Sequence, residues 1–129
     1  MELVNKRIAI FDDDEDILSI CSFVLEDGGW EVFTFPDCKN IVEKVTELNP
    51  AVILMDNWIP DTGGIVATRL LKASPEVKDI PVIYFSANSK ISDLAAEAGA
   101  DSYLAKPFDL KDLEKIISEN AKTKNSKLS

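Results

Sequence analysis

The segment Ala51-Val-Ile-Leu-Met55, followed directly by Asp56, contains five apolar residues in a row and no polar residue among them. An apolar run without polar alternation is typical of a strand that is covered on both faces, as strands are in parallel sheets. It is far shorter than the stretch needed to cross a membrane. The segment therefore predicts a central strand of a parallel sheet with an acidic residue at its carboxyl end.

Four further segments resemble it in length and in their content of apolar, β-branched or aromatic residues: Arg7–Phe11, Glu31–Phe35, Pro81–Phe85 and Ser102–Ala105. Between the strands, apolar residues recur at helical spacing, and we expect each such face to pack in the core. The expected faces are Ile17, Leu18, Ile20, Cys21, Val24 and Leu25; Ile41, Val42, Val45 and Leu48; Ile65, Val66, Leu70 and Leu71; Ile91, Leu94, Ala95 and Ala98; and Leu110, Leu113, Ile116 and Ile117.

Strands and helices thus alternate five times, which predicts an α/β fold with helices on both faces of a parallel sheet. Right-handed crossovers leave few topologies, and the common one is the flavodoxin-like (βα)5 doubly wound sandwich with strand order 2-1-3-4-5. We expect residues 1–121 to form this domain. Residues 122–129 are polar and are expected to be a tail or a truncated linker.

The composition excludes several classes of function. A formal net charge of −9, from 23 acidic and 14 basic residues, argues against direct nucleic-acid binding. The chain has no histidine, so it can hold neither a Ser-His-Asp triad nor a His-zinc site. The N-terminal segment has no apolar signal-peptide core, so a cytoplasmic location without membrane contact is expected. The two cysteines, Cys21 and Cys38, are expected to be free and partly buried.

Polar side chains follow four of the five predicted strands. Because ligands of such sheets bind beyond the carboxyl ends of the strands, these side chains should meet at one edge. They are Asp12 and Asp13 after the first strand, Asp56 after the third, Ser86 after the fourth and Lys106 after the fifth.

This set of residue types makes chemical sense for phosphoryl chemistry. Clustered carboxylates repel one another unless a cation lies among them, and hard oxygen ligands suit Mg²⁺. A carboxylate beside Mg²⁺ can attack phosphorus and form an aspartyl phosphate, while a lysine and a hydroxyl stabilise the transferred group. Each residue also has a plainer interpretation, as a helix N-cap, a turn residue or part of a surface turn. Only their joint placement argues for a site.

With these motifs assembled, the sequence resembles the receiver domain of two-component response regulators, chemotaxis-regulator-like phospho-acceptor domains, over about residues 6–120. The matching pieces are Ile-Ala-Ile-Phe-Asp12-Asp13-Asp14-Glu-Asp-Ile, Val-Ile-Leu-Met-Asp56-Asn-Trp-Ile-Pro60 with Gly64, Phe-Ser86-Ala87, Ala-Gly99-Ala100-Asp-Ser-Tyr103 and Lys106-Pro107-Phe108.

The resemblance implies a role for each matching position. Asp56 would be the phosphorylated residue, acting with Ser86 and Lys106. The metal, Mg²⁺ or Mn²⁺, would be held by Asp12, Asp13, Asp56 and the backbone carbonyl of Trp58, with Asp13 the more direct ligand of the pair. Ser86 and Tyr103 would be the switch residues, and the Lys106–Pro107 peptide bond would be cis.

The resemblance also implies partners and a mode of action. A histidine kinase or a His-phosphotransfer protein would donate the phosphoryl group, and small acyl phosphates could replace it. The domain is not a conventional enzyme, although it would catalyse its own phosphorylation and dephosphorylation. Phosphorylation would remodel the surface of the fourth helix, fifth strand and fifth helix, near Ile91, Leu94 and Tyr103, through which the family dimerises or binds targets.

Four positions depart from the family pattern. Ile59 stands where Met is usual, and Gly63 stands where Asp is frequent, which makes the loop at Gly63-Gly64 a candidate for unusual mobility. Trp58 is large and apolar, and Asn88 is uncharged. We hypothesise that these last two side chains flank the phosphoryl group and that a bulky Trp58 slows its hydrolysis.

Three other functions remain open at this point. A haloacid-dehalogenase-type phosphatase would use an Asp-x-Asp pair, which Asp12-x-Asp14 superficially fits, but the rest of that motif and a late acidic pair are missing. A flavodoxin-type cofactor binder would need a phosphate-cradling loop where this chain has an acidic one. A degenerate receiver would only bind proteins, and the full acidic, Asp, Ser and Lys set argues against it.

Overall fold

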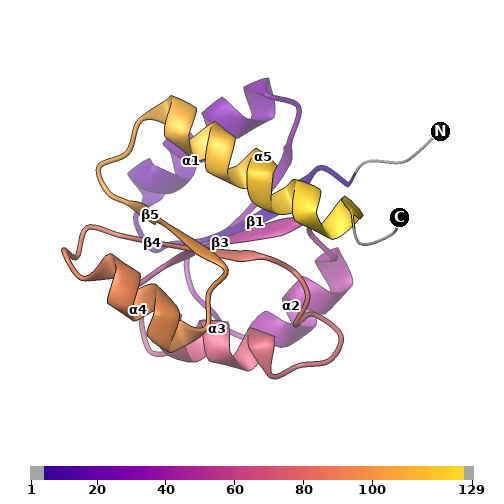
Figure 1. Cartoon of the computed structure of the whole chain (residues 1–129), viewed down its shortest axis with the longest axis vertical. Helices are drawn as coiled ribbons and strands as arrows, with labels where there is room; N and C mark the ends of the chain where they lie inside the picture. Colours follow the sequence, from indigo (N-terminus) through magenta and orange to yellow (C-terminus); the bar gives the residue numbers. More distant parts are fainter. Residues whose placement is uncertain (1–4, 127–129) are drawn as a thin grey trace.

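The computed structural model describes residues 5–126, and side chains as far as Ala121. Five strands alternate with five helices in this part of the chain (Figure 1). In chain order they are β1 (Arg7–Phe11), α1 (Glu15–Asp27), β2 (Glu31–Phe35), α2 (Ile41–Leu48), β3 (Val52–Asp56), α3 (Gly64–Lys72), β4 (Val82–Ser86), α4 (Ile91–Ala98), β5 (Ser102–Ala105) and α5 (Leu110–Ser126).

The strands form a single parallel sheet of order β2-β1-β3-β4-β5, which confirms the predicted topology. The register pairs Ile8 with Val52 and Ile53 with Val82, so β3 lies at the centre between β1 and β4. Parallel pairing brings all five carboxyl ends to the same edge. The residues that follow β1, β3, β4 and β5 therefore share that edge.

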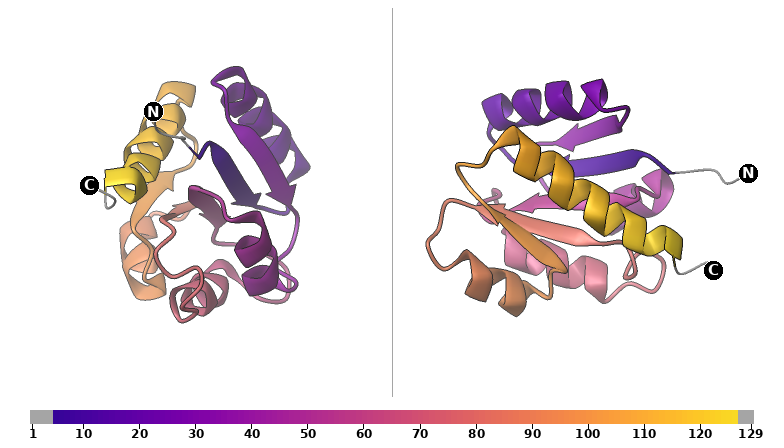
Figure 2. Two further views of the ribbon diagram at one scale, coloured as in Figure 1. Left: turned by 90° about the vertical axis from the view of Figure 1, so that its right-hand side faces the viewer. Right: turned by 45° about the horizontal axis from the view of Figure 1, so that its top comes forward.

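Helices α1 and α5 cover one face of the sheet, and α2, α3 and α4 cover the other (Figures 1 and 2). Alternate residues of β1 enter the two resulting cores, since Ile8 and Ile10 pack with α1 and α5 whereas Ala9 and Phe11 pack with the other three helices. All five residues of β3 are buried. This double coverage explains why the central strands read as continuous apolar runs.

The buried face of α3 differs from the predicted one. Val66 and Leu70 are exposed, and the residues turned inward are Gly64, Ala67, Thr68 and Leu71. These follow the i, i+3, i+4, i+7 pattern of a helix face, and they begin at the glycine that contacts β3. Close contact at Gly64 sets the rotation of α3, so two large apolar residues face solvent. Ile20 and Leu110, also expected in the core, are exposed.

The element boundaries differ slightly from those predicted. Strands β3 and β4 each begin and end one residue later, at Val52–Asp56 and Val82–Ser86. Helix α5 continues to Ser126, five residues beyond the predicted domain end at 121. Residues 1–4 of the N-terminal segment and 127–129 of the polar tail lie outside the described residues. Among the described helices, none has the length and apolar character needed to span a membrane.

Candidate functional site

The acidic run after β1 serves two purposes. Asp14 is the N-cap of α1, and its carboxylate accepts hydrogen bonds from the backbone N–H groups of Asp16 and Ile17. Asp12 is buried, with only 1% of its surface exposed, and its Oδ1 accepts from the N–H of Asp14 at 2.9 Å. The capping interpretation of the run is thus correct for Asp14, while Asp12 and Asp13 face the carboxyl edge of the sheet.

Asp56 is the last residue of β3 and is buried. Its Oδ2 accepts a hydrogen bond from the backbone N–H of Trp58 at 3.1 Å. One carboxylate oxygen from each of Asp12, Asp13 and Asp56 lies within 4.8 Å of the others. Two segments more than forty positions apart in the sequence therefore present their carboxylate oxygens to one small volume.

Lys106, which follows β5, joins two of these carboxylates. Its Nζ lies 3.0 Å from Oδ2 of Asp12 and 2.9 Å from Oδ1 of Asp56. The same ammonium lies 4.4 Å from the centre of the Phe85 ring, within cation–π range. The Lys106–Pro107 peptide bond is cis, and the backbone N–H of Lys106 donates to the carbonyl of Ser86 at 2.9 Å.

The protonation equilibria reflect this crowding. The pKa of Asp56 lies above its ordinary value of 3.8, because burial and then the charge of Asp12 raise it more than the Lys106 hydrogen bond lowers it. Burial alone lowers the pKa of Lys106, but its hydrogen bonds to Asp56 and Asp12 outweigh burial, so its pKa lies above the ordinary value. The Lys106 ammonium therefore keeps its charge. Its hydrogen bond to Asp56 does not fully offset the cost of burying the negative charge of that carboxylate.

The donor set fits a divalent cation. Three carboxylates and one ammonium in contact leave a formal charge of −2 at the site. Carboxylate oxygens are the ligands that Mg²⁺ prefers, and Mg²⁺ takes few protein ligands because it retains several waters. Asp13 is exposed to solvent, whereas backbone N–H groups of Asp14 and Trp58 hold the carboxylates of Asp12 and Asp56 in place.

Of the remaining expected residues, the structure brings Ser86 and Trp58 to the same edge. The Oγ of Ser86 accepts from the backbone N–H of Asn88 at 3.0 Å. Trp58 is 77% exposed beside Asp56. Tyr103 lies within the edge strand β5 and is 45% exposed. Ile91, expected on the apolar face of its helix and close to the surface through which the family binds partners, is buried.

One pair of polar residues near Asp56 was missed from the sequence. The hydroxyl of Tyr84, a buried residue of β4, donates a hydrogen bond to Oδ1 of Asn57. A Cβ on Gly64 would lie 3.0 Å from that hydroxyl and 2.2 Å from the backbone oxygen of Asp56. A buried tyrosine usually requires a partner for its hydroxyl, which was the available signal.

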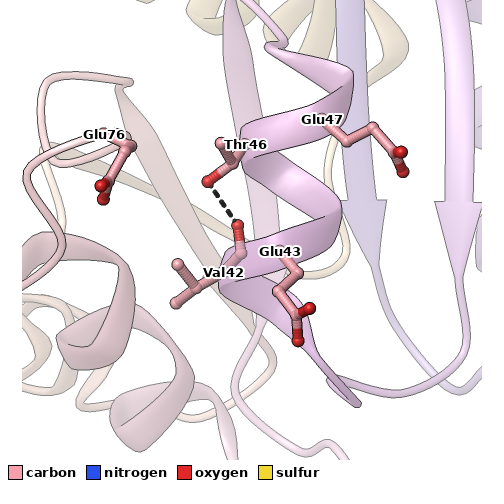
Figure 3. A pocket seen from close by; sticks show the side chains of 5 residues that line it. All are labelled: Val42, Glu43, Thr46, Glu47 and Glu76. Atoms are coloured by element: carbon pink, nitrogen blue, oxygen red, sulfur yellow. Dashed lines mark hydrogen bonds between the residues drawn. The ribbon is translucent and has the colours of Figure 1, made fainter.

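A second group of acidic residues lines an open groove between α2 and the connection from α3 to β4 (Figure 3). The carboxylates of Glu43, Glu47 and Glu76 point in different directions there, and the Thr46 hydroxyl donates to the carbonyl of Val42 at 2.7 Å. These side chains form no convergent ligand set.

A parallel five-stranded sheet with a carboxylate cluster and a lysine at its carboxyl edge is the arrangement expected of a receiver domain. The family model of the response regulator receiver domain matches residues 8–118. The chain therefore belongs to the receiver domain family of two-component response regulators, as the resemblance predicts.

Individual relatives agree with this assignment. The chain is 34% identical over 110 residues to the phosphate regulon transcriptional regulatory protein PhoB of Klebsiella pneumoniae, covering 84% of this chain and 48% of PhoB. It is 36% identical over 113 residues to the transcriptional regulatory protein PrrA of Mycobacterium tuberculosis, covering 86% of this chain and 48% of PrrA. The chain thus spans about half the length of these curated relatives.

Solved structures show the same fold. A CheY-like receiver domain protein from Methanospirillum hungatei is 28% identical, with a TM-score of 0.83 over 95% of this chain and 98% of that one. The receiver domain of the sensor histidine kinase PA1611 from Pseudomonas aeruginosa is 26% identical, with a TM-score of 0.83 over 91% and 98% of the two chains. That structure holds a magnesium ion in its active-site cleft.

Proposed function

We propose that Asp56 accepts a phosphoryl group from a histidine kinase or a His-phosphotransfer protein in a Mg²⁺-dependent reaction. The observation that carries this proposal is the convergence of Asp12, Asp13 and Asp56 within 4.8 Å, with Lys106 bonded to two of them. The magnesium-containing relative supports the choice of metal. Mn²⁺ has the same preference for oxygen ligands and would substitute.

Each residue has a defined part in the transfer. An ionised oxygen of Asp56 attacks the phosphorus, and the bond from phosphorus to the donor breaks, leaving its electrons on the donor's imidazole nitrogen or carboxylate oxygen. No general base is needed, because the nucleophile carries no proton. Lys106 lies close enough to Asp56 to bond an oxygen of the incoming group.

The metal would be held by the carboxylates of Asp12, Asp13 and Asp56 and by the backbone carbonyl of Trp58. When bound, Mg²⁺ supplies positive charge to the phosphoryl oxygens and offsets the charge of −2 at the site. The N–H of Trp58 already bonds Asp56, so the turn that carries that carbonyl is tied to the acceptor. Water bound at the same edge would later hydrolyse the acyl phosphate, which makes dephosphorylation intrinsic to the domain.

The output is a conformational switch. A phosphoryl group on Asp56 adds negative charge and acceptor oxygens, which attract the hydroxyl of Ser86 away from Asn88. Tyr103, half-exposed on β5, then moves inward toward the vacated space. The surface of α4, β5 and α5 changes as a result and is the expected site of dimerisation or target binding. We expect the protein to act in the cytoplasm, away from nucleic acid and membrane.

Labelling with acetyl phosphate tests the proposal directly. Wild type should gain one phosphoryl group by mass spectrometry when Mg²⁺ is present and none when Mg²⁺ is chelated, and Asp56→Asn should gain none. Glu47→Gln, an exposed substitution on α2, is the matched control and should label like wild type. Failure of wild type to label would favour a degenerate receiver that only binds proteins, and turnover of a phosphomonoester would favour a phosphatase.

A further inference from the structure

Tyr84 is a fully buried residue of β4 whose hydroxyl reaches toward the phosphoryl site. Its ring packs in the core between the sheet and α2, α3 and α4. Its hydroxyl donates to the side-chain carbonyl of Asn57, the residue directly after Asp56. The aromatic ring thus connects the core to the loop that directly follows the acceptor.

Asn57 is held at three points, and the Tyr84 hydroxyl is the one supplied by a side chain. The backbone N–H of Asn57 donates to the carbonyl of Phe85 at 3.2 Å, which extends the β3–β4 pairing by one residue. The backbone carbonyl of Asn57 accepts from the backbone N–H of Gly64 at 3.0 Å, at the start of α3. Asn57 stands between Asp56 and Trp58, so its orientation determines where the acceptor carboxylate and the next peptide lie.

The surroundings leave this hydrogen bond little freedom. Gly64 approaches so closely that an added Cβ would lie 3.0 Å from the Tyr84 hydroxyl. Burial, with smaller effects of the charges of Asp56 and Glu97, raises the pKa of Tyr84 to about 12. The hydroxyl is therefore protonated, and able to donate, throughout the neutral pH range.

We propose that Tyr84 is a positioning residue of the phosphoryl site, which orients Asn57 and thereby the Asp56–Trp58 backbone that binds the metal and presents the acceptor. This inference rests on the proposed function of Asp56. Within residues 5–126, the Tyr84 hydroxyl bonds Asn57 rather than the carboxylates or Lys106, so its effect passes through Asn57.

The competing interpretation is that the Tyr84–Asn57 hydrogen bond only stabilises the fold, because a buried hydroxyl without a partner costs free energy. The chain offers a matched control in Thr68, on α3. Its hydroxyl is buried and makes no hydrogen bond among the described residues. Thr68→Val and Tyr84→Phe both remove one buried hydroxyl and keep the volume of the side chain, but only Tyr84→Phe releases Asn57.

The test measures Mg²⁺ affinity by tryptophan fluorescence in a Trp30→Phe background, where the signal comes from the exposed Trp58. It also measures the initial rate of labelling by acetyl phosphate at several Mg²⁺ concentrations. Tyr84→Phe should weaken Mg²⁺ binding about three- to tenfold, as expected for the loss of a neutral hydrogen bond. Thr68→Val should bind Mg²⁺ like wild type. Urea unfolding of each variant confirms that it is folded under the assay conditions.

A double-mutant cycle separates positioning from stability. Asn57→Ala should weaken Mg²⁺ binding to a similar degree, and the Tyr84→Phe/Asn57→Ala variant should be no worse than either single variant, because one contact is removed in all three. Unchanged Mg²⁺ affinity in Tyr84→Phe, or effects that add in the double variant, would overturn the inference while leaving the proposed function intact. A wild type that neither binds Mg²⁺ nor labels would overturn both.

Discussion

The Nζ of Lys106 lies 2.9 Å from Oδ1 of Asp56, although the two residues are 50 positions apart in the chain. The same nitrogen bonds Asp12, so a single ammonium bridges the ends of β1 and β3 from the loop after β5. This bridge neutralises part of the charge that the clustered carboxylates create. It also places the ammonium within reach of a phosphoryl group bonded to Asp56, where it could bind one of the phosphoryl oxygens.

Replacing Lys106 should therefore separate metal binding from phosphoryl transfer. In Lys106→Met, we expect labelling by acetyl phosphate to slow by about 100-fold, because the transition state loses a charged hydrogen-bond donor. Mg²⁺ binding should persist or tighten, since the ammonium no longer competes for Asp12 and Asp56. Lys111→Met, on the exposed part of α5, is the control for loss of one positive charge. Equal labelling rates in Lys106→Met and wild type would contradict the assigned role.

Asp56→Asn should stabilise the metal-free protein. The pKa of Asp56 is raised mainly by burial, so the folded state holds this proton more tightly than the unfolded chain. The associated stability is therefore present at low pH and lost as the pH rises through the folded pKa, and the ionised carboxylate destabilises the fold at pH 7. We expect the free energy of unfolding to rise by about 1 kcal/mol in Asp56→Asn with chelator present.

Urea unfolding at several pH values measures this effect. The difference between Asp56→Asn and wild type should shrink as the pH is lowered through the folded pKa of Asp56. Glu47→Gln, which removes an exposed carboxylate, should stay within about 0.5 kcal/mol of wild type. A less stable Asp56→Asn would mean that the Lys106 ion pair, rather than burial, governs the energy of Asp56.

The start of α3 cannot accept a side chain at Gly64. A Cβ there would lie 2.2 Å from the backbone oxygen of Asp56, which cannot swing aside as a flexible side chain could. We expect Gly64→Ala to lower the free energy of unfolding by more than about 3 kcal/mol and to impair labelling. Gly28→Ala is the matched control, because Gly28 has a φ of −85° and its nearest contact would be 3.4 Å. Thermal unfolding of both variants distinguishes the steric effect from the general effect of Gly→Ala.

Trp58 is expected to protect the acyl phosphate. The backbone N–H of Trp58 donates to Asp56, and its indole is exposed. We expect this large ring to reach over the phosphorylated carboxylate and to limit the approach of water. Trp58→Ala should shorten the phosphoryl half-life about threefold, which corresponds to a barrier lower by about 0.6 kcal/mol. Phe23→Ala removes an equally exposed aromatic ring from α1 and should leave the half-life unchanged. A longer-lived phosphate in Trp58→Ala would refute the hypothesis.

The sequence predicts the sheet well because its signals are local. The apolar run at 51–55 and its counterparts require coverage on both faces, and the alternation with helical segments then leaves few topologies. The rotation of α3 about its own axis is not encoded in the local sequence, because it depends on a contact with another element. Val66 and Leu70 are as apolar as Leu71, and only the contact of Gly64 with the end of β3 selects which of them is buried.

The same distinction applies to the site. The rule that ligands bind beyond the carboxyl ends of strands is sufficient to place Asp12, Asp13, Asp56 and Lys106 on one edge. It does not give contacts between side chains, such as the bond between Tyr84 and Asn57, which are 27 positions apart. Nor does it tell which members of an acidic run cap the helix and which join the carboxylate cluster, because Asp12 and Asp14 are chemically identical.

Cys21 and Cys38 should be inert in the folded protein. Both are free and buried, and burial is the main cause that raises the pKa of Cys21 to about 11 and that of Cys38 to about 12. Their ordinary value is 9.0, so at pH 8 the reactive thiolate is scarcer in the folded than in the unfolded chain. Iodoacetamide should modify neither residue in the native protein at pH 8 and both residues in urea, as read by mass spectrometry.

The same shifts make stability depend on alkaline pH. The folded state binds both thiol protons more tightly, so this contribution is complete below about pH 9 and is lost as the pH rises through 11 and 12. Above pH 9, the free energy of unfolding should fall by up to about 1.4 kcal/mol per pH unit for each thiol ionised only in the unfolded chain. The Cys21→Ala/Cys38→Ala variant should have a lower free energy of unfolding below pH 9, because the substitutions leave cavities. Above pH 9, its free energy of unfolding should lack the part of the decrease that the two thiols cause. An unchanged slope in that variant, or rapid native alkylation at pH 8, would show that the thiols are not held protonated by burial.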